Sequence, residues 1–247
     1  MQKIKNLIRF LLSYTYFPFL VPLAKKRIRN FLKNNPNIND SVKWVSNFYI
    51  GPGVRGLNIN FKAGQIESEI TPLLSLLEKE NPRRILEIGT ASGGTLFLFS
   101  RVLCQEGEIT SIDLPFGKYG AGYLKSHMPL FKEFINPNQE MHLIRKDSHK
   151  DETIESFKEI LKNNQLDFLF IDGDHTYKGV SSDFEKYKNF VKPGGIIALH
   201  DIVENHLDTS MEVWKFWNDI KNDYKHEEFI DNLNNKYGCG IGVIYNH

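Results

Sequence analysis

The stretch ILEIGTASGG, Ile85 to Gly94, joins a short run of strand-forming residues to a glycine-rich turn. An apolar pattern with helical spacing follows it, from Thr95 to Leu103. Glycines let the backbone turn tightly and approach a ligand closely, and a helix that starts there offers free N–H groups. A strand, a tight turn and a helix in this order indicate the start of a βαβ unit.

The same alternation of strand and helix patterns continues along the rest of the chain. Strands are predicted at Ile85–Ile88, Glu108–Ile112, Met141–Ile144, Leu166–Ile171 and Ile196–Leu199, with two last pieces near Glu228 and at Gly240–Tyr245. Helices are predicted at Ile66–Glu80, Thr95–Leu103, Asp151–Lys162, Gly179–Phe190 and Ser210–Lys221. We therefore expect an α/β protein with a Rossmann-like, doubly wound, mostly parallel seven-stranded sheet and helices on both faces. In such sheets ligands bind at the carboxyl ends of the strands, near the topological switch point.

Length and composition narrow the class of protein. The 247 residues suffice for one large domain, expected over 61–247, with an N-terminal helical extension and linker over 1–60. The formal net charge of +1 lacks the basic excess of a nucleic-acid binder, so we expect no nucleic-acid partner. Cys104 and Cys239 match no metal-ligand spacing and are interpreted as reduced thiols of a cytoplasmic protein.

The N-terminus carries an uncharged run, Phe10 to Ala24, between two groups of basic residues. Pro18 and Pro22 interrupt this run, which is too short and too broken to span a bilayer as a helix. Two interpretations remain open. The segment forms helices that pack on the main domain or on a second subunit, or residues 1–33 anchor the protein peripherally at anionic lipid on the inner face of the membrane.

Polar residues stand at the ends of the first three strands. Glu87 precedes a GxxxGG pattern, which differs from the dinucleotide fingerprint GxGxxG, and its carboxylate suits a ligand with a cationic end. Asp113 follows the second strand, where it can accept both hydroxyl hydrogens of a ribose or cap a turn. Asp147 and Ser148 follow the third strand, at a position that suits an adenine edge, although Asp147 alone is more typical of a helix cap.

The last two predicted parallel strands end in titratable chemistry. The stretch IDGDHTY, Ile171 to Tyr177, places two carboxylates and an imidazole within four residues, and His200-Asp201 follows the fifth strand. An Asx-rich turn that caps the next helix is the structural alternative for IDGDHTY. Acids at five successive strand ends indicate a cofactor-dependent transfer site.

With these residues the chain resembles class I S-adenosylmethionine-dependent methyltransferases, over roughly Gln65 to His247. The ExGxxxGG loop, the acid after the second strand, the Asp-Ser pair and the Pro-Gly-Gly before the fifth strand follow the family's order. The pieces IDGDHTY, LHD and VWKFW make it most similar to small-molecule O-methyltransferases of sugar and natural-product pathways. The resemblance implies that Glu87, Gly89, Thr90, Gly93 and Gly94 line the methionine part of the cofactor, that Asp113 binds its ribose, and that Asp147 and Ser148 lie near its adenine.

Several related O-methyltransferases hold a divalent cation at positions that match Asp172, His200 and Asp201. A bound cation lowers the pKa of an acceptor hydroxyl and orients it. The resemblance also places a basic residue at His175, whose ordinary pKa suits general-base work, with Asp174 as its partner or as a cap. The His-Asp pair departs from the oxygen ligands of these relatives and favours Mn or Fe over Mg. In the alternative without metal, His200 ligates nothing and His175 works with Asp174 as an acid/base pair.

The expected activity is methyl transfer from S-adenosylmethionine to a hydroxyl of a small molecule, such as a sugar or glycoconjugate. A lipid-linked glycan acceptor would account for both the apolar, basic N-terminus and a cytoplasmic catalytic domain. A nicotinamide-dependent oxidoreductase is an alternative that the missing GxGxxG argues against. A hydroxylase-like protein and a non-catalytic S-adenosylmethionine-binding protein of the same fold are two further alternatives. Pairing of two subunits through N-terminal elements is also expected from the resemblance.

Overall fold

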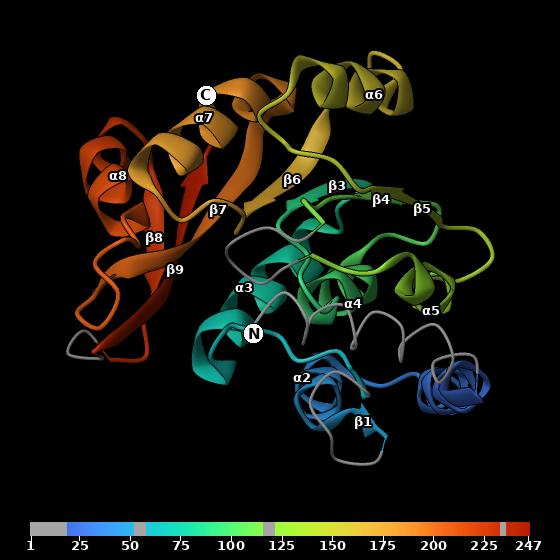
Figure 1. Cartoon of the computed structure of the whole chain (residues 1–247). Coiled ribbons are helices and arrows are strands. Elements are labelled where there is room, and N and C mark those ends of the chain that lie inside the picture. Colours follow the sequence, from blue (N-terminus) through green and yellow to red (C-terminus); the bar gives the residue numbers. More distant parts are fainter. Residues whose placement is uncertain (1–18, 52–57, 116–121, 233–235) are drawn as a thin grey trace, which may run out of the picture.

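The computed structural model describes residues 19–51, 58–115, 122–232 and 236–247. Its main sheet has seven strands in the order β5-β4-β3-β6-β7-β9-β8 (Figure 1). The strands are β3 (Arg84–Ile88), β4 (Glu108–Ile112), β5 (Glu140–Ile144), β6 (Leu166–Ile171), β7 (Val191–Asn205), β8 (His226–Phe229) and β9 (Tyr237–Tyr245). The pairs from β5 to β7 are parallel, and β9 runs antiparallel to both of its neighbours. The predicted α/β fold with a mostly parallel seven-stranded sheet is confirmed.

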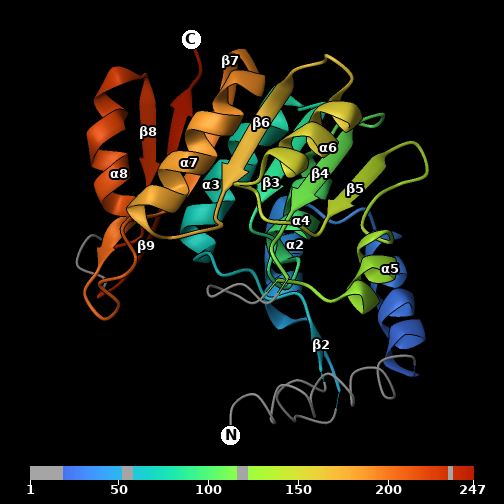
Figure 2. The same ribbon diagram turned by 45° about the horizontal axis from the view of Figure 1, so that its top comes forward.

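Helices cover both faces of this sheet (Figures 1 and 2). One layer contains α2 (Ile38–Asn47), α3 (Glu67–Glu80), α4 (Gly94–Val102) and α5 (Met128–Phe131), and the other contains α6 (Asp151–Leu161), α7 (Tyr177–Tyr187) and α8 (Val213–Ile220). Short 3₁₀ helices lie at Lys125–His127, Lys188–Phe190 and Lys221–Asp223, and a separate hairpin pairs β1 (Tyr49–Ile50) with β2 (Ile59–Asn60).

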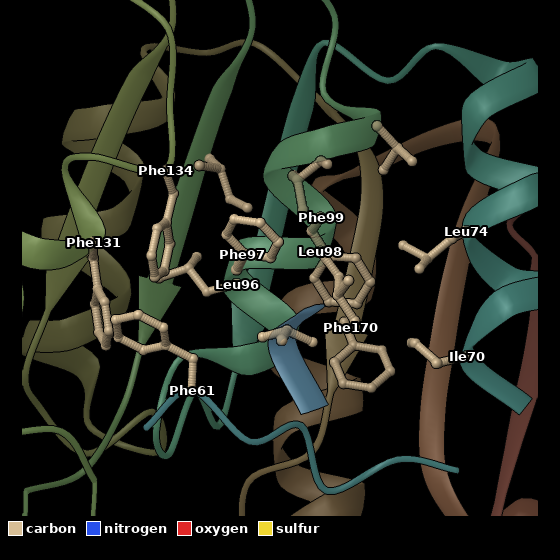
Figure 3. Close-up of a cluster of buried hydrophobic side chains, with 14 of the residues drawn as sticks. Phe61, Ile70, Leu74, Leu96, Phe97, Leu98, Phe99, Phe131, Phe134 and Phe170 are labelled. Carbon is tan, nitrogen blue, oxygen red and sulfur yellow. The ribbon is translucent and has the colours of Figure 1, made fainter. Parts of the chain in front are cut away.

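Successive side chains of the central strands enter opposite cores, as the two-residue period of a strand requires. Phe168 and Phe170 of β6 face the core shared with α3 and α4, whereas Leu169 and Ile171 face the core shared with α7 and α8. Figure 3 shows the first core, where the rings of Phe97, Phe99 and Phe170 fill the space between the sheet and its helices. Both faces are buried, which is why the parallel strands are continuous apolar runs rather than alternating ones.

The described part of the N-terminal segment packs on the main domain. Residues 19–32 are helical and bury Leu20, Ala24 and Ile28 in the first core. Phe31 stacks on Trp44 with ring centroids 4.5 Å apart, and Arg29 donates to Glu133 at 2.6 and 2.9 Å. The apolar run predicted from Phe10 lies partly outside the described residues. Among the described helices, none is long and apolar enough to cross a membrane.

The strand β7 is longer than its predicted range Ile196–Leu199 at both ends. It includes the Pro193-Gly194-Gly195 turn signal, and it continues through His200 and Asp201 to Asn205, so this pair lies within the strand and not after it as predicted. Asn246 donates its backbone N–H to Gly195 at 2.8 Å, and Gly194 donates to Asn246 at 2.7 Å. The C-terminal end of the chain thus extends the ladder across residues that sequence alone assigns to a turn. The other predicted strands agree to within three residues where bounds were given. The β1–β2 hairpin and α5 were missed because each is very short.

The two central strands of the sheet approach each other closely at Gly89. Asp172 donates its backbone N–H to Ile88 at 2.8 Å just after β6 ends. Gly89 has a φ of +90°, and a Cβ there would overlap the carbonyl oxygen of Asp172. Gly89 is therefore required both by its backbone conformation and by the close approach of the two strand ends.

Gly89→Ala is expected to destabilise the fold more than Gly194→Ala, which provides a matched control. Gly194 also has a positive φ, of +75°, but no atom lies within 4 Å of a Cβ added there. We expect Gly194→Ala to cost about 1–2 kcal/mol from backbone strain alone. Gly89→Ala adds overpacking of about 1–3 kcal/mol or more. Chemical denaturation measures both, and equal losses for the two variants would contradict the close approach.

Candidate active site

The carboxyl ends of the central strands surround a cavity of about 530 Å³ at the switch point between β3 and β6. Nine of the residues singled out in the sequence line it: Gly89, Asp113, Asp147, Ser148, Asp172, Asp174, His175, His200 and Asp201. A volume in this range is typical of small-molecule and cofactor pockets. The structure thus brings the strand-end residues together at one pocket, and their individual roles remain predictions.

Four of the residues expected to line the cofactor lie behind the pocket wall. Glu87 is fully buried, and Thr90, which is 2% exposed, donates its hydroxyl to Glu87 at 2.6 Å. A Cβ on Gly93 would lie 2.5 Å from the ring of Phe131, and one on Gly94 would overlap the backbone at Phe61. In this structure the two glycines are therefore required by packing within the protein. Contact of these four residues with the cofactor stays a prediction.

Glu87 is a neutral group at pH 7 in this structure. Burial raises the pKa of its carboxyl from 4.5 to about 8, against the hydrogen bonds from Thr90 and Thr95 that lower it. The nearby charges of Asp113 and Asp172 raise this pKa further. A protonated carboxyl beneath the loop removes the repulsion that a third buried anion would cause.

Glu87→Gln is expected to change the pH dependence of stability. A carboxyl whose pKa is raised from 4.5 to about 8 contributes stability that is fully present below pH 4.5 and is lost as the pH rises through about 8. Relative to wild type, the variant should gain stability across this window by an amount on the order of a few kcal/mol. Urea denaturation at several pH values measures the difference. Glu78→Gln, at an exposed glutamate of α3, is the control, and the same pH dependence in both variants would contradict the assignment.

Asp113 holds the glycine-rich loop from the end of β4. Its Oδ2 accepts the backbone N–H of Ala91 at 2.7 Å, and Ala91 has a φ of +46°. Burial raises the pKa of Asp113 to about 6, although backbone N–H groups around the carboxylate lower it. The residue therefore shapes the loop and faces the cavity at the same time. Its predicted contact with a ribose is compatible with this position.

Two carboxylates and two imidazoles meet beyond the end of β6 and beside the register shift within β7, which continues past His200 and Asp201 to Asn205. His200 Nδ1 lies 3.2 Å from Asp172 Oδ1 and 3.3 Å from Asp201 Oδ1. His175 Nδ1 lies 3.0 Å from Asp201 Oδ2, and His175 Nε2 lies 3.5 Å from Asp172 Oδ1. Gln65 donates to the other oxygen of Asp172 at 2.7 Å. The four titratable groups therefore form one contiguous cluster.

The electrostatics of this cluster favour protonated imidazoles beside ionised carboxylates. Burial lowers the pKa of both imidazoles, but the carboxylates of Asp201 and Asp172 outweigh it and raise the pKa of His175 and, more strongly, of His200. Burial likewise opposes ionisation of Asp201, yet His200 and His175 hold the pKa of Asp201 below its usual range. The ion pairs offset the desolvation that isolated buried charges would suffer.

Asp174 points to the start of α7. Its Oδ1 accepts the backbone N–H of Thr176 at 3.0 Å, and a Cβ on Gly179 would overlap its carboxylate. Thr176 caps α7 by accepting the N–H of Gly179 at 3.1 Å. This geometry is the Asx turn that the sequence offered as an alternative. The carboxylates seen against His175 are Asp201 and Asp172, so the predicted pairing of His175 with Asp174 is not among the ion pairs of the described residues.

The cluster has donor atoms that fit a divalent cation. Ligand atoms of Asp172, His175 and Asp201 lie within 4.8 Å of one another, and so do those of His200, Asp201 and Cys239. Neighbouring ligands of an octahedral ion at about 2.1 Å are roughly 3 Å apart, close to the separations in the cluster. A set of imidazole and carboxylate donors suits a transition metal better than Mg. Metal binding at Asp172, His200 and Asp201 stays a prediction.

Sequence reasoning missed His149 as a pocket residue. Its Nε2 lies 3.3 Å from the fully buried Asp183, and its Nδ1 lies 3.5 Å from Asp147. The hydrogen bond with Asp183 is the main cause that raises the pKa of His149, against the effect of burial. Its position directly after Asp147-Ser148 was the signal that could have found it. Cys239 was missed because only the pairing of the last strand brings it to the site.

Comparisons with known proteins agree with this fold. Residues 86–202 match a family model described as a methyltransferase domain. Tapetum-specific methyltransferase 1 of Arabidopsis thaliana is 30% identical over 129 residues, which cover 51% of this chain and 50% of that protein. An uncharacterized protein of Acanthamoeba polyphaga mimivirus is 32% identical over 129 residues, which cover 52% and 55% respectively. The chain thus spans about half the length of these two relatives.

Solved structures share the fold at lower identity. The O-methyltransferase TomG of Streptomyces achromogenes, in complex with SAM, superposes with a TM-score of 0.53 at 15% identity over 86% of this chain and 91% of that one. An O-methyltransferase of Bacillus cereus, in complex with SAH, gives a TM-score of 0.51 at 19% identity over 70% and 78%. The class I methyltransferase fold expected from the sequence is confirmed.

Proposed function

We propose that this chain, whose residues 86–202 form a methyltransferase domain on a class I methyltransferase fold, transfers a methyl group from S-adenosylmethionine to a hydroxyl of a small molecule. The observation that carries the proposal is the pocket at the switch point, which Asp113, Asp147 and the histidine–aspartate cluster line together. A cofactor and an acceptor bound side by side would bring the reacting atoms together there. Methyl transfer then depends mainly on the placement of the two reactants.

His175 is the proposed general base. Its ring lines the pocket and contacts Asp201 and Asp172, which orient the imidazole and stabilise the imidazolium formed when the acceptor hydroxyl loses its proton. A divalent cation bound to this cluster would lower the pKa of that hydroxyl. The general base must be neutral to accept a proton, so the raised pKa of His175 favours activity above its ordinary value of 6.5.

The proposed acceptor is a sugar or glycoconjugate, because the pocket wall near the cluster is polar. Asp174 and Thr176, which follow β6, line the pocket next to the histidine–aspartate cluster, and Lys146 lines it after β5. Such groups can hydrogen-bond several hydroxyls of one substrate. Carboxylates on every side disfavour the pyrophosphate of a nicotinamide dinucleotide, which weakens the oxidoreductase alternative. A hydroxylase-like or non-catalytic protein of the same fold would bind the adenosyl ligand without transferring its methyl group.

Thermal unfolding with S-adenosylhomocysteine tests cofactor binding. At about a hundredfold the dissociation constant, a ligand stabilises the folded state by ~2.7 kcal/mol, or roughly 5–10 °C for a domain of this size. We expect this shift in the wild type and its loss in Asp113→Ala. NAD should produce no shift. A shift with NAD and none with S-adenosylhomocysteine would contradict the proposal and revive the oxidoreductase.

The His175→Gln variant tests the role of the general base separately from cofactor binding. We expect the S-adenosylhomocysteine shift to persist while methyl transfer to a sugar acceptor falls by about 10²- to 10⁴-fold, the usual contribution of a general base. His206→Gln is the matched control, because the His206 side chain is 60% exposed. Full activity in His175→Gln would contradict its role as base, and binding without turnover in wild type would favour the non-catalytic alternative.

We further propose that the protein is cytoplasmic and contacts anionic lipid through its N-terminal segment. In the described part of residues 1–33, Phe19 and Leu23 are 79% and 49% exposed on the outer face of the helix, and Lys26 is exposed on the same segment. Apolar side chains beside basic ones are typical of helices that lie in a membrane interface. Contact with membrane would bring the pocket to a lipid-linked acceptor. Pairing of two subunits through the same face is the competing proposal.

Sedimentation with phosphatidylserine vesicles tests the lipid contact. Wild type should bind these vesicles at low salt, and binding should weaken at high salt or with neutral vesicles. The double variant Phe19→Ser/Leu23→Ser should bind several-fold less. Leu207→Ser, at a leucine that is 61% exposed, is the control. Equal sedimentation of all three proteins would contradict the proposal. So would a wild-type dimer that dissociates in the double variant.

A further inference from the structure

Two non-glycine residues with left-handed backbone lie at one irregularity of the β7–β9 pair. Asp201 has a φ of +64°, and Cys239 has a φ of +83°. They lie at the point where the register of the two strands shifts, between His200 and Val203. Conformations of this kind are uncommon outside glycine and gather at functional sites. The irregularity turns both side chains away from the regular alternation of the ladder.

The side chains of His200, Asp201 and Cys239 converge at this irregularity. One ligand atom from each lies within 4.8 Å of the others. His200 is 6% exposed, and its Nδ1 contacts Asp172 at 3.2 Å. Its Nε2 is buried and has no hydrogen-bond partner within the described part of the chain. A buried ring nitrogen without a partner, on an imidazole that lies near a thiol and a carboxylate, is available for coordination.

A carboxylate of α3 fixes the turn that presents the thiol. Glu69 is 1% exposed and accepts the backbone N–H of Gly240 at 3.0 Å and that of Asp231 at 3.1 Å. Gly240 directly follows Cys239, so this contact holds the Gly-Cys-Gly backbone against the helix. The thiol is thus carried by a supported backbone, as expected of a preorganised ligand.

We propose that His200, Asp201 and Cys239 bind one thiophilic transition-metal ion, such as Zn²⁺, Co²⁺ or Fe²⁺, through imidazole nitrogen, carboxylate oxygen and thiolate sulfur. Thiolate and imidazole ligands select these ions over Mg²⁺. Binding replaces the S–H bond of Cys239 with a metal–sulfur bond and releases the proton to solvent. The ion lies on the β9 side of the cluster and leaves Asp172 and His175 facing the cavity.

A second set of donors in the cluster competes with this assignment. Asp172, His175 and Asp201 offer a site of two carboxylates and one imidazole, and Asp201 belongs to both sets. The sets are alternatives for a single ion, because one small carboxylate anchors both. The buried, unpartnered nitrogen of His200 and the strained backbone of Cys239 favour the set that contains the thiol.

Cobalt(II) titration followed by absorption spectroscopy distinguishes the two sets. We expect wild type to show an intense near-ultraviolet thiolate-to-cobalt band and a metal-dependent rise in unfolding temperature. Cys239→Ser should lose the band and weaken metal binding by roughly 10- to 100-fold or more. Cys104→Ser removes the chain's other cysteine and should keep the band and the affinity. Cobalt binding without a thiolate band would overturn the proposal.

Cys239→Gly controls for damage to the fold. Glycine adopts a φ of +83° without strain, so the metal-free variant should unfold at the wild-type temperature or above it, yet gain no stability from cobalt. Asp172→Asn should keep the thiolate band. Loss of metal binding in Asp172→Asn with unchanged binding in Cys239→Ser would assign the ion to the competing set. None of these readouts uses the methyl donor, so they stand apart from the test of methyl transfer.

Discussion

The main-chain contact between the ends of β3 and β6 is the constraint on which the rest of the site depends. Asp172 donates to the carbonyl of Ile88 at 2.8 Å, and only glycine fits at position 89 beneath the Asp172 carbonyl. In the sheet, β4 and β5 lie on the β3 side of this contact, whereas β7 lies on the β6 side. The connections therefore diverge from the contact. The pocket opens where they diverge. Because the two strand ends are held together, Asp113 and the histidine–aspartate cluster face one cavity rather than two separate ones.

The charges of the two aspartates and two histidines near this contact balance one another. With both imidazoles protonated, His175 and His200 neutralise Asp172 and Asp201, and the buried charges are paired as an apolar interior requires. Glu87, beneath the loop, is neutral at pH 7 because its pKa is about 8. Neutralising either imidazole would leave a buried carboxylate without its cationic partner. The same ion pairs therefore make the stability of the cluster depend on the protonation of His175 and His200.

The fold and the location of the site could be predicted from sequence because both follow from local signals. Apolar runs, glycines and the acid after each run place Asp113, Asp147 and Asp172 just beyond carboxyl ends of strands, and parallel pairing brings such ends to one edge. Asp201 also follows an apolar run, but it lies within β7 because that strand continues to Asn205. The sequence could not show that Glu87 lies behind the pocket wall or that Phe131 is the neighbour of Gly93, because these contacts depend on tertiary packing. The extension of β7 likewise depends on pairing with the C-terminal end of the chain.

The presence of a cysteine at position 239, where the backbone is left-handed, is explained by tertiary structure and not by local sequence preference. Its neighbours Gly238 and Gly240 have φ values of +79° and +83°, so glycine already serves this backbone conformation on either side. A non-glycine residue there costs about 1–3 kcal/mol of strain. Asp201, on the facing strand, tolerates the left-handed region at a lower cost because its short polar side chain can hydrogen-bond locally. A cysteine has no such compensation, and its thiol lies within 4.8 Å of a ligand atom of the buried His200 imidazole. The strain is explained if the thiol itself has a ligand to bind.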